Sequence, residues 1–199
     1  HSEDGSEVLL REHIKGRERF RCIDLPAGRE GKKPALVAGM QHASSDWIIQ
    51  TDADCRLGSY FVEAHLSCRL ETTADLVAGM VTTEERKNGL LQVLERLDLL
   101  SLTGAGAGSF HLGRPLMCSG ANLAYSRSLF NDTHSFPPGR GVASGDDMFV
   151  MIGARKLGKK LVYLTSRKAL VKTRAANNLI SLLNQRIRWG AKTPFYRQP

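Results

Sequence analysis

Apolar and polar residues alternate along the chain in blocks that predict strands and helices in turn. Short apolar runs predict strands, whereas longer runs with an apolar residue at every third or fourth position predict helices. This alternation is typical of an α/β layer fold with a mainly parallel sheet flanked by helices. The expected helices are 7–14, 34–43, 60–70, 90–102, 148–157 and 178–192, and the expected strands are 21–25, 47–51, 76–82, 161–164 and 169–172.

The organisation of the chain indicates one domain over residues 1–199. With 199 residues and 42% hydrophobic composition, the chain is long enough to bury one sizeable core. We find no internal repeat and no low-complexity linker. The alternating glycines of residues 104–109 are interpreted as a flexible or tightly packed connection. No apolar run reaches the ~18 residues that a membrane-spanning helix requires.

Charge and cysteine content narrow the classes of partner. A net charge of +8 suits anionic partners such as nucleotide diphosphates or acidic lipid surfaces. Nucleic acid is not expected, because only 7% of the residues are aromatic and few could stack on bases. The four cysteines lack a CxxC spacing, which argues against zinc and for a reducing cytosol. Cys118 is expected to be a small buried apolar side chain.

Two carboxylates follow the apolar strand expected at 47–51. On an extended chain, Asp52 and Asp54 would point to the same side, roughly 6.5–7 Å apart. Ligands collect at the carboxyl ends of strands in open α/β sheets, and paired carboxylates suit Mg²⁺ or Mn²⁺ that also binds substrate phosphates. The alternative is that both acids form a turn or cap the next helix.

A second acidic pair stands directly before the helix expected at 148–157. Ser144 can cap that helix, and Asp146 and Asp147 would favour its positive end. In the functional alternative, Asp147 is a general base that accepts a proton from an attacking hydroxyl. Such a base must lie within hydrogen-bonding reach of that hydroxyl.

The helix expected at 178–192 carries a polar and aromatic facet beside its apolar stripe. Gln185, Arg188 and Trp189 fall within an arc of roughly 100°. Trp189 offers a flat face to a sugar ring, Gln185 offers hydrogen bonds, and Arg188 offers a fork for phosphate oxygens. The alternative is an amphipathic helix lying on a membrane surface, and the two interpretations are compatible.

The order of these motifs resembles the family 2 glycosyltransferases, especially membrane-embedded members similar to cellulose synthase and hyaluronan synthase. TDAD (residues 51–54) resembles the family's metal-binding DxD. SGDD (residues 144–147) stands where the family carries a Glu-Asp base motif, and QRIRW (residues 185–189) is similar to the family's QxxRW. Three further stretches resemble family loops. These are residues 1–6, after a paired-acid motif, residues 31–36, whose Lys32 would lie near the nucleotide, and residues 119–122, beneath the acceptor.

The resemblance implies a Rossmann-like GT-A fold, incomplete at its N-terminus, and inverting transfer from a nucleotide-sugar donor, expected to be a UDP-sugar. The acceptor would be a glycan or a lipid. Asp52 and Asp54 would hold Mg²⁺ or Mn²⁺ on the donor diphosphate, and Asp147 would be the base, with Asp146 beside it. The implied acceptor-binding and diphosphate-binding residues are Gln185, Arg188, Trp189, Ser119 and Gly120.

The sequence also departs from the family pattern. Asp146 stands where Glu is usual, a mild change that keeps the carboxylate. The family's first strands would precede His1, and transmembrane helices would follow QRIRW. We therefore expect a full-length membrane protein at the cytoplasmic face, and a soluble chain that alone binds nucleotide weakly and transfers little or no sugar.

Two other function classes stay open. One is a metal-dependent phosphohydrolase or nucleotidyltransferase that uses the same carboxylates. The sugar platform of residues 185–189 argues against it, because hydrolysis does not need one. The other is a non-catalytic sugar-nucleotide-binding module, against which the intact Asp147 argues.

Overall fold

The computed structural model describes residues 5–26, 28–84, 89–134 and 146–191. The chain forms two compact units, His1–Ser44 and Ser45–Pro199. The first unit contains the helices α1 (Ser6–Ile14) and α2 (Lys32–His42). Helix α2 begins two residues earlier than predicted, directly after Gly31, whose φ of 99° suits glycine.

The strand predicted at 21–25 is wrong. This stretch has no regular secondary structure, and the unit's described residues form no strand with which it could pair. Asp24 instead accepts hydrogen bonds from the Arg11 guanidinium of α1 at 2.6 and 2.7 Å. The apolar residues at 21–25 were therefore not sufficient to predict a strand, because a strand also requires a second strand with which its backbone can form hydrogen bonds.

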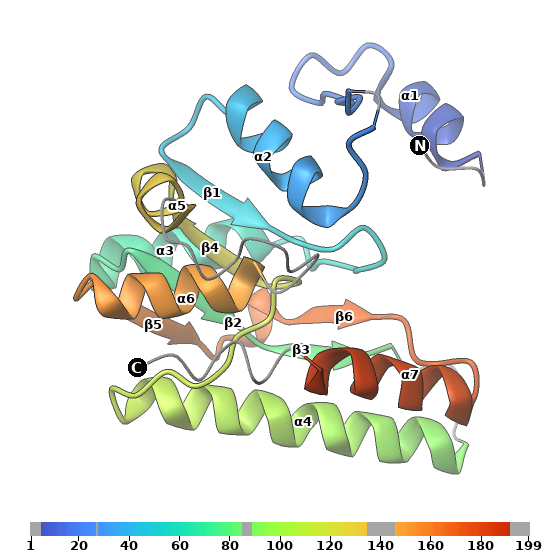
Figure 1. Ribbon diagram of the computed structural model, residues 1–199, viewed down its shortest axis with the longest axis vertical. Coiled ribbons are helices and arrows are strands. Elements are labelled where there is room, and N and C mark those ends of the chain that lie inside the picture. The colour runs from blue at the N-terminus through green and yellow to red at the C-terminus, as the bar shows by residue number, and fades with distance from the viewer. Residues whose placement is uncertain (1–4, 27, 85–88, 135–145, 192–199) are drawn as a thin grey trace. The chain divides into compact units, whose positions relative to one another are not determined.

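A four-stranded sheet forms the centre of the second unit (Figure 1). Strand β4 (Leu123–Ser126) runs antiparallel to both β1 (Trp47–Gln50) and β2 (Leu76–Gly79), whereas β2 and β5 (Leu161–Leu164) are parallel. The predicted α/β fold is confirmed. Strand β4 and helix α5 (Arg127–His134) were not predicted. In spatial order the strands are β1 (Trp47–Gln50), β4 (Leu123–Ser126), β2 (Leu76–Gly79) and β5 (Leu161–Leu164).

A second, two-stranded parallel sheet pairs β3 (Val81–Thr83) with β6 (Val171–Thr173). The strand predicted at 76–82 is divided at Met80, so that β2 and β3 belong to different sheets. The Met80 carbonyl accepts hydrogen bonds from the Val171 N–H at 3.1 Å and from Asn122 Nδ2 at 2.8 Å. The strand predicted at 169–172 begins later, because Ala169 ends the 3₁₀-helix η2 (Arg167–Ala169).

Helices cover the sheet on both faces. Helix α3 (Phe61–Thr72) packs on β2 and β5, and its Cys68 shares a buried cluster with Val77 and Ala124. Successive side chains of a strand point to opposite faces. Tyr125 of β4 therefore lies on the other face and stacks on Phe130 of α5. Helix α5 contacts α6, which is drawn in front of the sheet in Figure 1. The remaining helices of this unit are α3 (Phe61–Thr72), α4 (Leu90–His111), α6 (Asp146–Lys156) and α7 (Leu179–Gly190).

The glycine-rich stretch 104–109 is not a connection but the last part of α4. Its tight packing was predicted correctly at one position. A Cβ on Gly106 would lie 3.2 Å from the Met117 carbonyl oxygen and 3.3 Å from Tyr163 of β5. Gly106 therefore lets α4 approach β5 closely, and this packing offsets the low helix propensity of glycine.

Candidate active site

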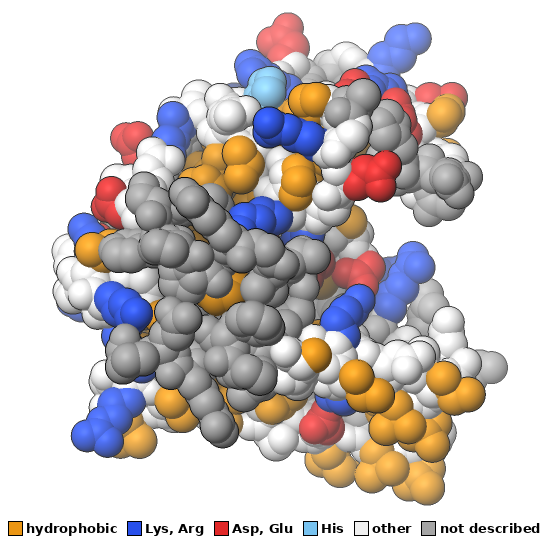
Figure 2. All heavy atoms as spheres, in the orientation of Figure 1, with side chains coloured by type: hydrophobic (Ala, Val, Ile, Leu, Met, Phe, Trp, Pro, Cys, Tyr) orange, Lys and Arg blue, Asp and Glu red, His pale blue; other side chains and the backbone are white. Residues whose placement is uncertain are grey.

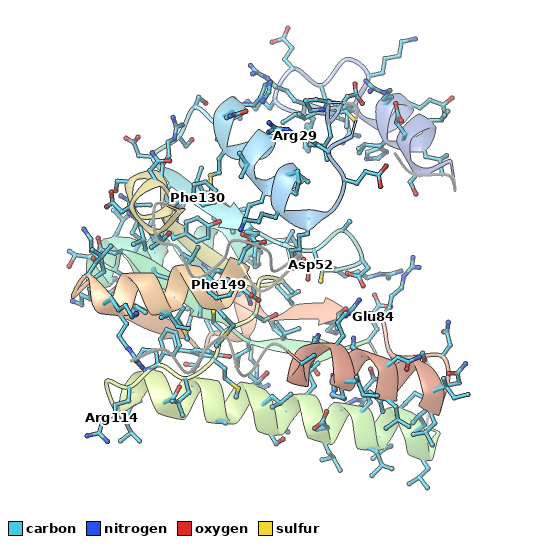
Figure 3. All side chains as sticks on the ribbon, viewed as in Figure 1. Arg29, Asp52, Glu84, Arg114, Phe130 and Phe149 are labelled. Carbon is cyan, nitrogen blue, oxygen red and sulfur yellow. The ribbon has the colours of Figure 1, made fainter. Side chains whose placement is uncertain are left out.

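The first carboxylate pair lies just beyond the carboxyl end of β1, where Figure 3 labels Asp52. The Cys55 N–H donates to the Asp52 carbonyl at 3.1 Å, which closes a turn over residues 52–55. The extended-chain spacing predicted for the two acids therefore does not apply, because Ala53 and Asp54 lie in this turn. Asp52 is half-buried and Asp54 is exposed.

The residue after this turn is anchored to the small sheet. Arg56 and Lys172 of β6 exchange backbone hydrogen bonds of 2.7 and 3.0 Å. The Arg56 side chain forms an ion pair of 2.6 Å with Glu84, which directly follows β3 (Figure 3). The turn thus spans the two sheets, and its position depends on both.

Asp147 lies in the first turn of α6 and is fixed by two backbone donors. Its Oδ2 accepts from the Gly120 N–H at 2.8 Å, and its Oδ1 accepts from the Met148 N–H at 2.9 Å. Asp146 is 5% exposed. Both acids therefore occupy the positive end of a helix. Ser144, predicted as a cap, lies outside the described residues.

The loop 119–122 connects the end of β1 with Asp147. Gly120 donates its N–H to Asp147, and its carbonyl accepts from Gln50 Nε2 at 3.2 Å. Gly120 is buried, and Ser119 Oγ accepts from the Ala121 N–H at 3.3 Å. The structure therefore joins the loop predicted to lie beneath the acceptor to the predicted base.

Asn122, the last residue of this loop, is fully buried and makes three side-chain hydrogen bonds. Its Nδ2 donates at 2.8 Å to the carbonyls of Met80 and Ala169, and its Oδ1 accepts from His65 Nε2 at 2.8 Å. Gly79 makes room for this amide, because a Cβ there would lie 2.4 Å from Asn122 Nδ2. The loop is thus held by Met80 between β2 and β3, by η2 and by α3.

No sequence pattern predicted a role for Gln50, Tyr125 or His65. Each is a buried polar residue, and Gln50 and Tyr125 stand in short apolar runs. A buried polar side chain normally requires a partner inside the protein. A polar residue at the end of an apolar strand, such as Gln50, is the one signal that could have pointed to this network.

Cys118 is half-buried beside the site, and its Sγ lies 3.5 Å from the Asp147 carbonyl oxygen. Burial, together with the negative charge of Asp147, raises the pKa of the Cys118 thiol well above its ordinary value. The thiol is therefore neutral at physiological pH and acts as a weak donor, not as a nucleophile.

Helix α7 contains the three predicted acceptor residues, and Arg186 contacts two of them, Gln185 and Trp189. Arg186 Nε donates to Asp98 of α4 at 2.6 Å, and Nη1 donates to Gln185 Oε1 at 2.9 Å. The Arg186 guanidinium lies 4.3 Å from the centre of the Trp189 ring. One face of Trp189 is therefore already covered, whereas Arg188 is exposed.

The capping of α7 agrees with the sequence-based start of the helix. Asn178 is the N-cap and forms a capping box with Ser181. Just before it, the buried Glu95 of α4 accepts from the Ala176 N–H at 2.9 and 3.2 Å. Lys192, the predicted last residue, lies outside the described residues.

An apolar surface lies over the beginnings of α4 and α7, at the lower right of Figure 2. None of the residues of α7 is buried. Within the described ranges, no helix combines the length and the apolar character that crossing a bilayer requires. The exposed aliphatic side chains of α4 and α7 are Leu90, Val93, Leu94, Leu97, Leu100, Leu179, Ile180, Leu183 and Ile187.

Metal binding can be judged from the donor set. In the part of the chain that the structure describes, no three His, Cys, Asp or Glu side chains are placed to hold an ion together. Asp52 and Asp54 would therefore supply no more than two protein ligands. This set fits Mg²⁺ or Mn²⁺, which use few carboxylates and complete their shell with water and substrate phosphates.

The family assignment rests on a match over most of the chain. Residues 1–133 match the family model described as "Glycosyl transferase family 2". The chain belongs to glycosyltransferase family 2. The matched region includes the turn after β1 and the loop 119–122, and it ends before Asp146 and α7.

Two curated relatives are N-acetylglucosaminyltransferases. The chain is 25% identical to that of Neorhizobium galegae, with 96% of the chain and 46% of the relative covered. It is 26% identical to that of Rhizobium meliloti (strain 1021), with 96% and 47% covered. The chain thus spans about half the length of the curated relatives it matches.

Solved structures show that the chain has the GT-A fold of this family. Glucosyl-3-phosphoglycerate synthase from Mycobacterium tuberculosis, in complex with Mn²⁺ and UDP-glucose, has a TM-score of 0.52 at 20% identity, covering 99% of this chain and 65% of that one. The same synthase with Mg²⁺ and UDP has a TM-score of 0.54 at 19% identity, with 100% and 66% covered.

Proposed function

We propose that the natural protein is an inverting, metal-dependent glycosyltransferase that moves a sugar from a UDP-sugar to a hydroxyl of a glycan or lipid acceptor. The observation that carries the proposal is the position of Asp147. Two backbone N–H groups hold its carboxylate at the start of α6, beside a loop that the family model covers. A base must be held in this way to stay within reach of a hydroxyl proton.

In the proposed reaction, Asp147 accepts the proton of the acceptor hydroxyl as its oxygen attacks the anomeric carbon. The new glycosidic bond forms while the bond from that carbon to the diphosphate breaks, and UDP leaves with the bonding electrons. A single displacement inverts the configuration at the anomeric carbon. Asp52 and Asp54 would hold Mg²⁺ or Mn²⁺, which offsets the negative charge of the departing diphosphate.

The remaining predicted residues bind substrate in this proposal. Lys32 of α2 would contact the donor nucleotide, and Ser119 and Gly120 would line the floor beneath the acceptor. On α7, the uncovered face of Trp189 would stack on a sugar ring, with Gln185 and Arg188 contacting hydroxyls or phosphate. The names of the curated relatives favour N-acetylglucosamine as the transferred sugar.

A membrane location is part of the proposal. Two observations support it. Helices α4 and α7 expose apolar side chains, and the net charge of +8 suits an anionic lipid surface. We expect the full-length protein to act at the cytoplasmic face of the membrane. Flotation with phosphatidylglycerol vesicles, compared with phosphatidylcholine vesicles, tests this location, and we expect the protein to float with the anionic lipid. A protein that floats with neither lipid would reject the proposed membrane location.

Product analysis tests the proposed reaction. The full-length protein is incubated with radiolabelled UDP-N-acetylglucosamine or UDP-glucose, Mn²⁺ and either chitin oligosaccharides or a lipid extract. We expect a labelled glycan or lipid whose new bond has the opposite anomeric configuration to the donor, and we expect EDTA to stop the reaction. Release of free sugar phosphate or free sugar alone would indicate a hydrolase instead.

A further inference from the structure

Two buried polar side chains lie between the sheet and the candidate base. Gln50 is the last residue of β1 and is 9% exposed, and Tyr125 of β4 has no exposed surface. Gln50 pairs with Leu123 in the sheet, and Tyr125 pairs with Ile48. Gln50 and Tyr125 are therefore diagonal neighbours on one face of the sheet, within reach of each other. The Tyr125 hydroxyl donates to Gln50 Oε1 at 2.9 Å.

The hydroxyl of Tyr125 fixes the orientation of the Gln50 amide. Burial, with the negative charges of Asp146 and Asp147, raises the pKa of Tyr125, so that its hydroxyl keeps its proton and remains a donor. The Gly120 carbonyl can only accept, so Gln50 faces it with Nε2, 3.2 Å away, and leaves Oε1 to accept from the Tyr125 hydroxyl. A flipped amide would place Gln50 Oε1 against the Gly120 carbonyl oxygen, two acceptors with no hydrogen between them.

The same glycine contacts Asp147 with its other polar group. Gly120 donates its N–H to Asp147 Oδ2 at 2.8 Å. A continuous series of hydrogen bonds therefore runs from Tyr125 through Gln50 and Gly120 to Asp147. Gln50 also stands only two residues before Asp52 in the chain. It therefore ends the strand that leads to the turn of Asp52 and Asp54, and its side chain contacts the loop 119–122.

We propose that Gln50 is a positioning residue, oriented by Tyr125, that holds the Gly120 peptide and thereby fixes Asp147 relative to the end of β1. As regards catalysis, this proposal rests on the proposed function. In this proposal, Gln50 keeps Asp147, which would accept the proton, at a fixed distance from Asp52 and Asp54, which would hold the metal on the donor. Small errors in such a distance reduce the rate far more than they reduce binding.

The surroundings argue that the contact supplies position more than stability. Gln50 adds no charge to a site already faced by Asp146 and Asp147 of α6, by Tyr125 of β4 and by the Cys118 thiol. Replacing Gln50 and Tyr125 together by apolar residues of the same shape would cost little stability, whereas replacing Gln50 alone leaves the Gly120 carbonyl without its buried donor. Only a polar side chain can hold the Gly120 carbonyl.

The test compares Gln50→Met and Tyr125→Phe with the wild type in the full-length protein. Met has nearly the volume of Gln and cannot donate to Gly120. Hydrogen exchange of the peptide that contains Gly120 should become faster in Gln50→Met, whereas exchange in β5 stays unchanged. With UDP-N-acetylglucosamine as donor, kcat should fall by about 10- to 100-fold, with the donor KM nearly constant.

Tyr125→Phe keeps the ring and removes only the hydroxyl, so it carries the test if Gln50→Met does not fold. We expect a smaller decrease of kcat, about threefold, and faster exchange at Gly120, because Gln50 then loses its fixed orientation. Gln41 of α2 provides the matched control, since it is exposed and Gln41→Met makes the same chemical change without removing a hydrogen bond of the network. It should leave both measurements unchanged.

The two measurements separate this proposal from the proposed function. Unchanged exchange at Gly120 in both variants would overturn the positioning role, and so would faster exchange with unchanged kcat. A wild type that transfers no sugar would reject the proposed function, while the exchange at Gly120 would still decide whether Gln50 holds this loop.

Discussion

The loop under Asp147 and the helix α7 both carry predicted site residues, but they are held differently. The loop is buried and tied by side chains of the core, namely Gln50, Asn122 and, through Asn122, His65. Helix α7 has no buried residue. It is attached to α4 through an exposed ion pair of Arg186, and through Glu95 just before its N-cap.

In the proposed function, this difference matches the precision that each part would require. A proton acceptor must lie within hydrogen-bonding distance of one hydroxyl, so a rigid support is favourable. A helix that binds an acceptor sugar through stacking can tolerate small displacements, because a flat ring contact has no single geometry. Changes behind Asp147 should therefore affect the rate or the fold, whereas changes at the base of α7 should affect acceptor binding modestly.

The largest effect is expected from Asp147→Asn. The amide cannot accept the proton, so transfer should fall by about 10²- to 10⁴-fold, or to background. Binding of UDP with Mn²⁺, measured by calorimetry on the full-length protein, should change little. Asp132→Asn on the exposed side of α5 is the control and should retain activity. Equal loss of binding and transfer would assign Asp147 to structure instead of catalysis.

The second effect concerns stability and is expected from Asn122→Ala. The substitution leaves the Met80 and Ala169 carbonyls and His65 without their buried partner, which should lower the free energy of unfolding by about 3 kcal/mol. Urea unfolding measures this change. Asn184→Ala, at an exposed position of α7, should have almost no effect. A similar loss in both variants would contradict the rigid support of the loop.

The sequence indicated the layers of the fold and the motifs, but not the network that connects them. Apolar runs predicted β1 and β5 almost to the residue, because polar residues and turns bound these runs clearly. The break at Met80 could not be predicted, since it depends on Asn122 and Val171 from distant parts of the chain. A local pattern records propensity, whereas a buried polar contact depends on the assembled fold.

The same limit applied to the candidate site. Asp147 was proposed from a motif and its position before a helix. Its link to Gly120 involves residues 27 positions apart in the sequence, and no local pattern encodes that distance. On α7, helical geometry predicted Gln185, Arg188 and Trp189 on one arc, and all three lie within the helix. It did not reveal that Arg186 would cover one face of Trp189, because this contact depends on rotamers and on Asp98 of α4.

A smaller effect is expected from the pH dependence of stability at His65. Burial lowers the pKa of His65 below the ordinary value of 6.5, although the hydrogen bond to Asn122 opposes this. Among the described residues, the buried Nδ1 has no hydrogen-bond partner, so protonation would bury a charge without an acceptor. Below pH 6.5 the unfolded chain therefore binds more protons than the folded protein.

The free energy of unfolding should consequently fall as the pH drops below the unfolded-state value, by up to about 1.4 kcal/mol per pH unit, until His65 titrates in the folded protein. Urea unfolding at several pH values measures the slope. His65→Gln should flatten it, whereas His111→Gln, at an exposed position of α4, should not. The same slope in both variants would place the proton uptake elsewhere.

The smallest effect is expected at the contact between α4 and α7. Asp98 and Arg186 are 47% and 23% exposed, so solvent screens their attraction, and a double-mutant cycle with alanine should give a coupling of about 0.5 kcal/mol. Loosening α7 in Asp98→Ala should raise the acceptor KM about twofold and leave kcat nearly constant. Glu71→Ala, an exposed change on α3, is the control. If Asp98→Ala instead lowered kcat as strongly as Asp147→Asn, α7 would require the same precision as the base, and the contrast between the two regions would fail.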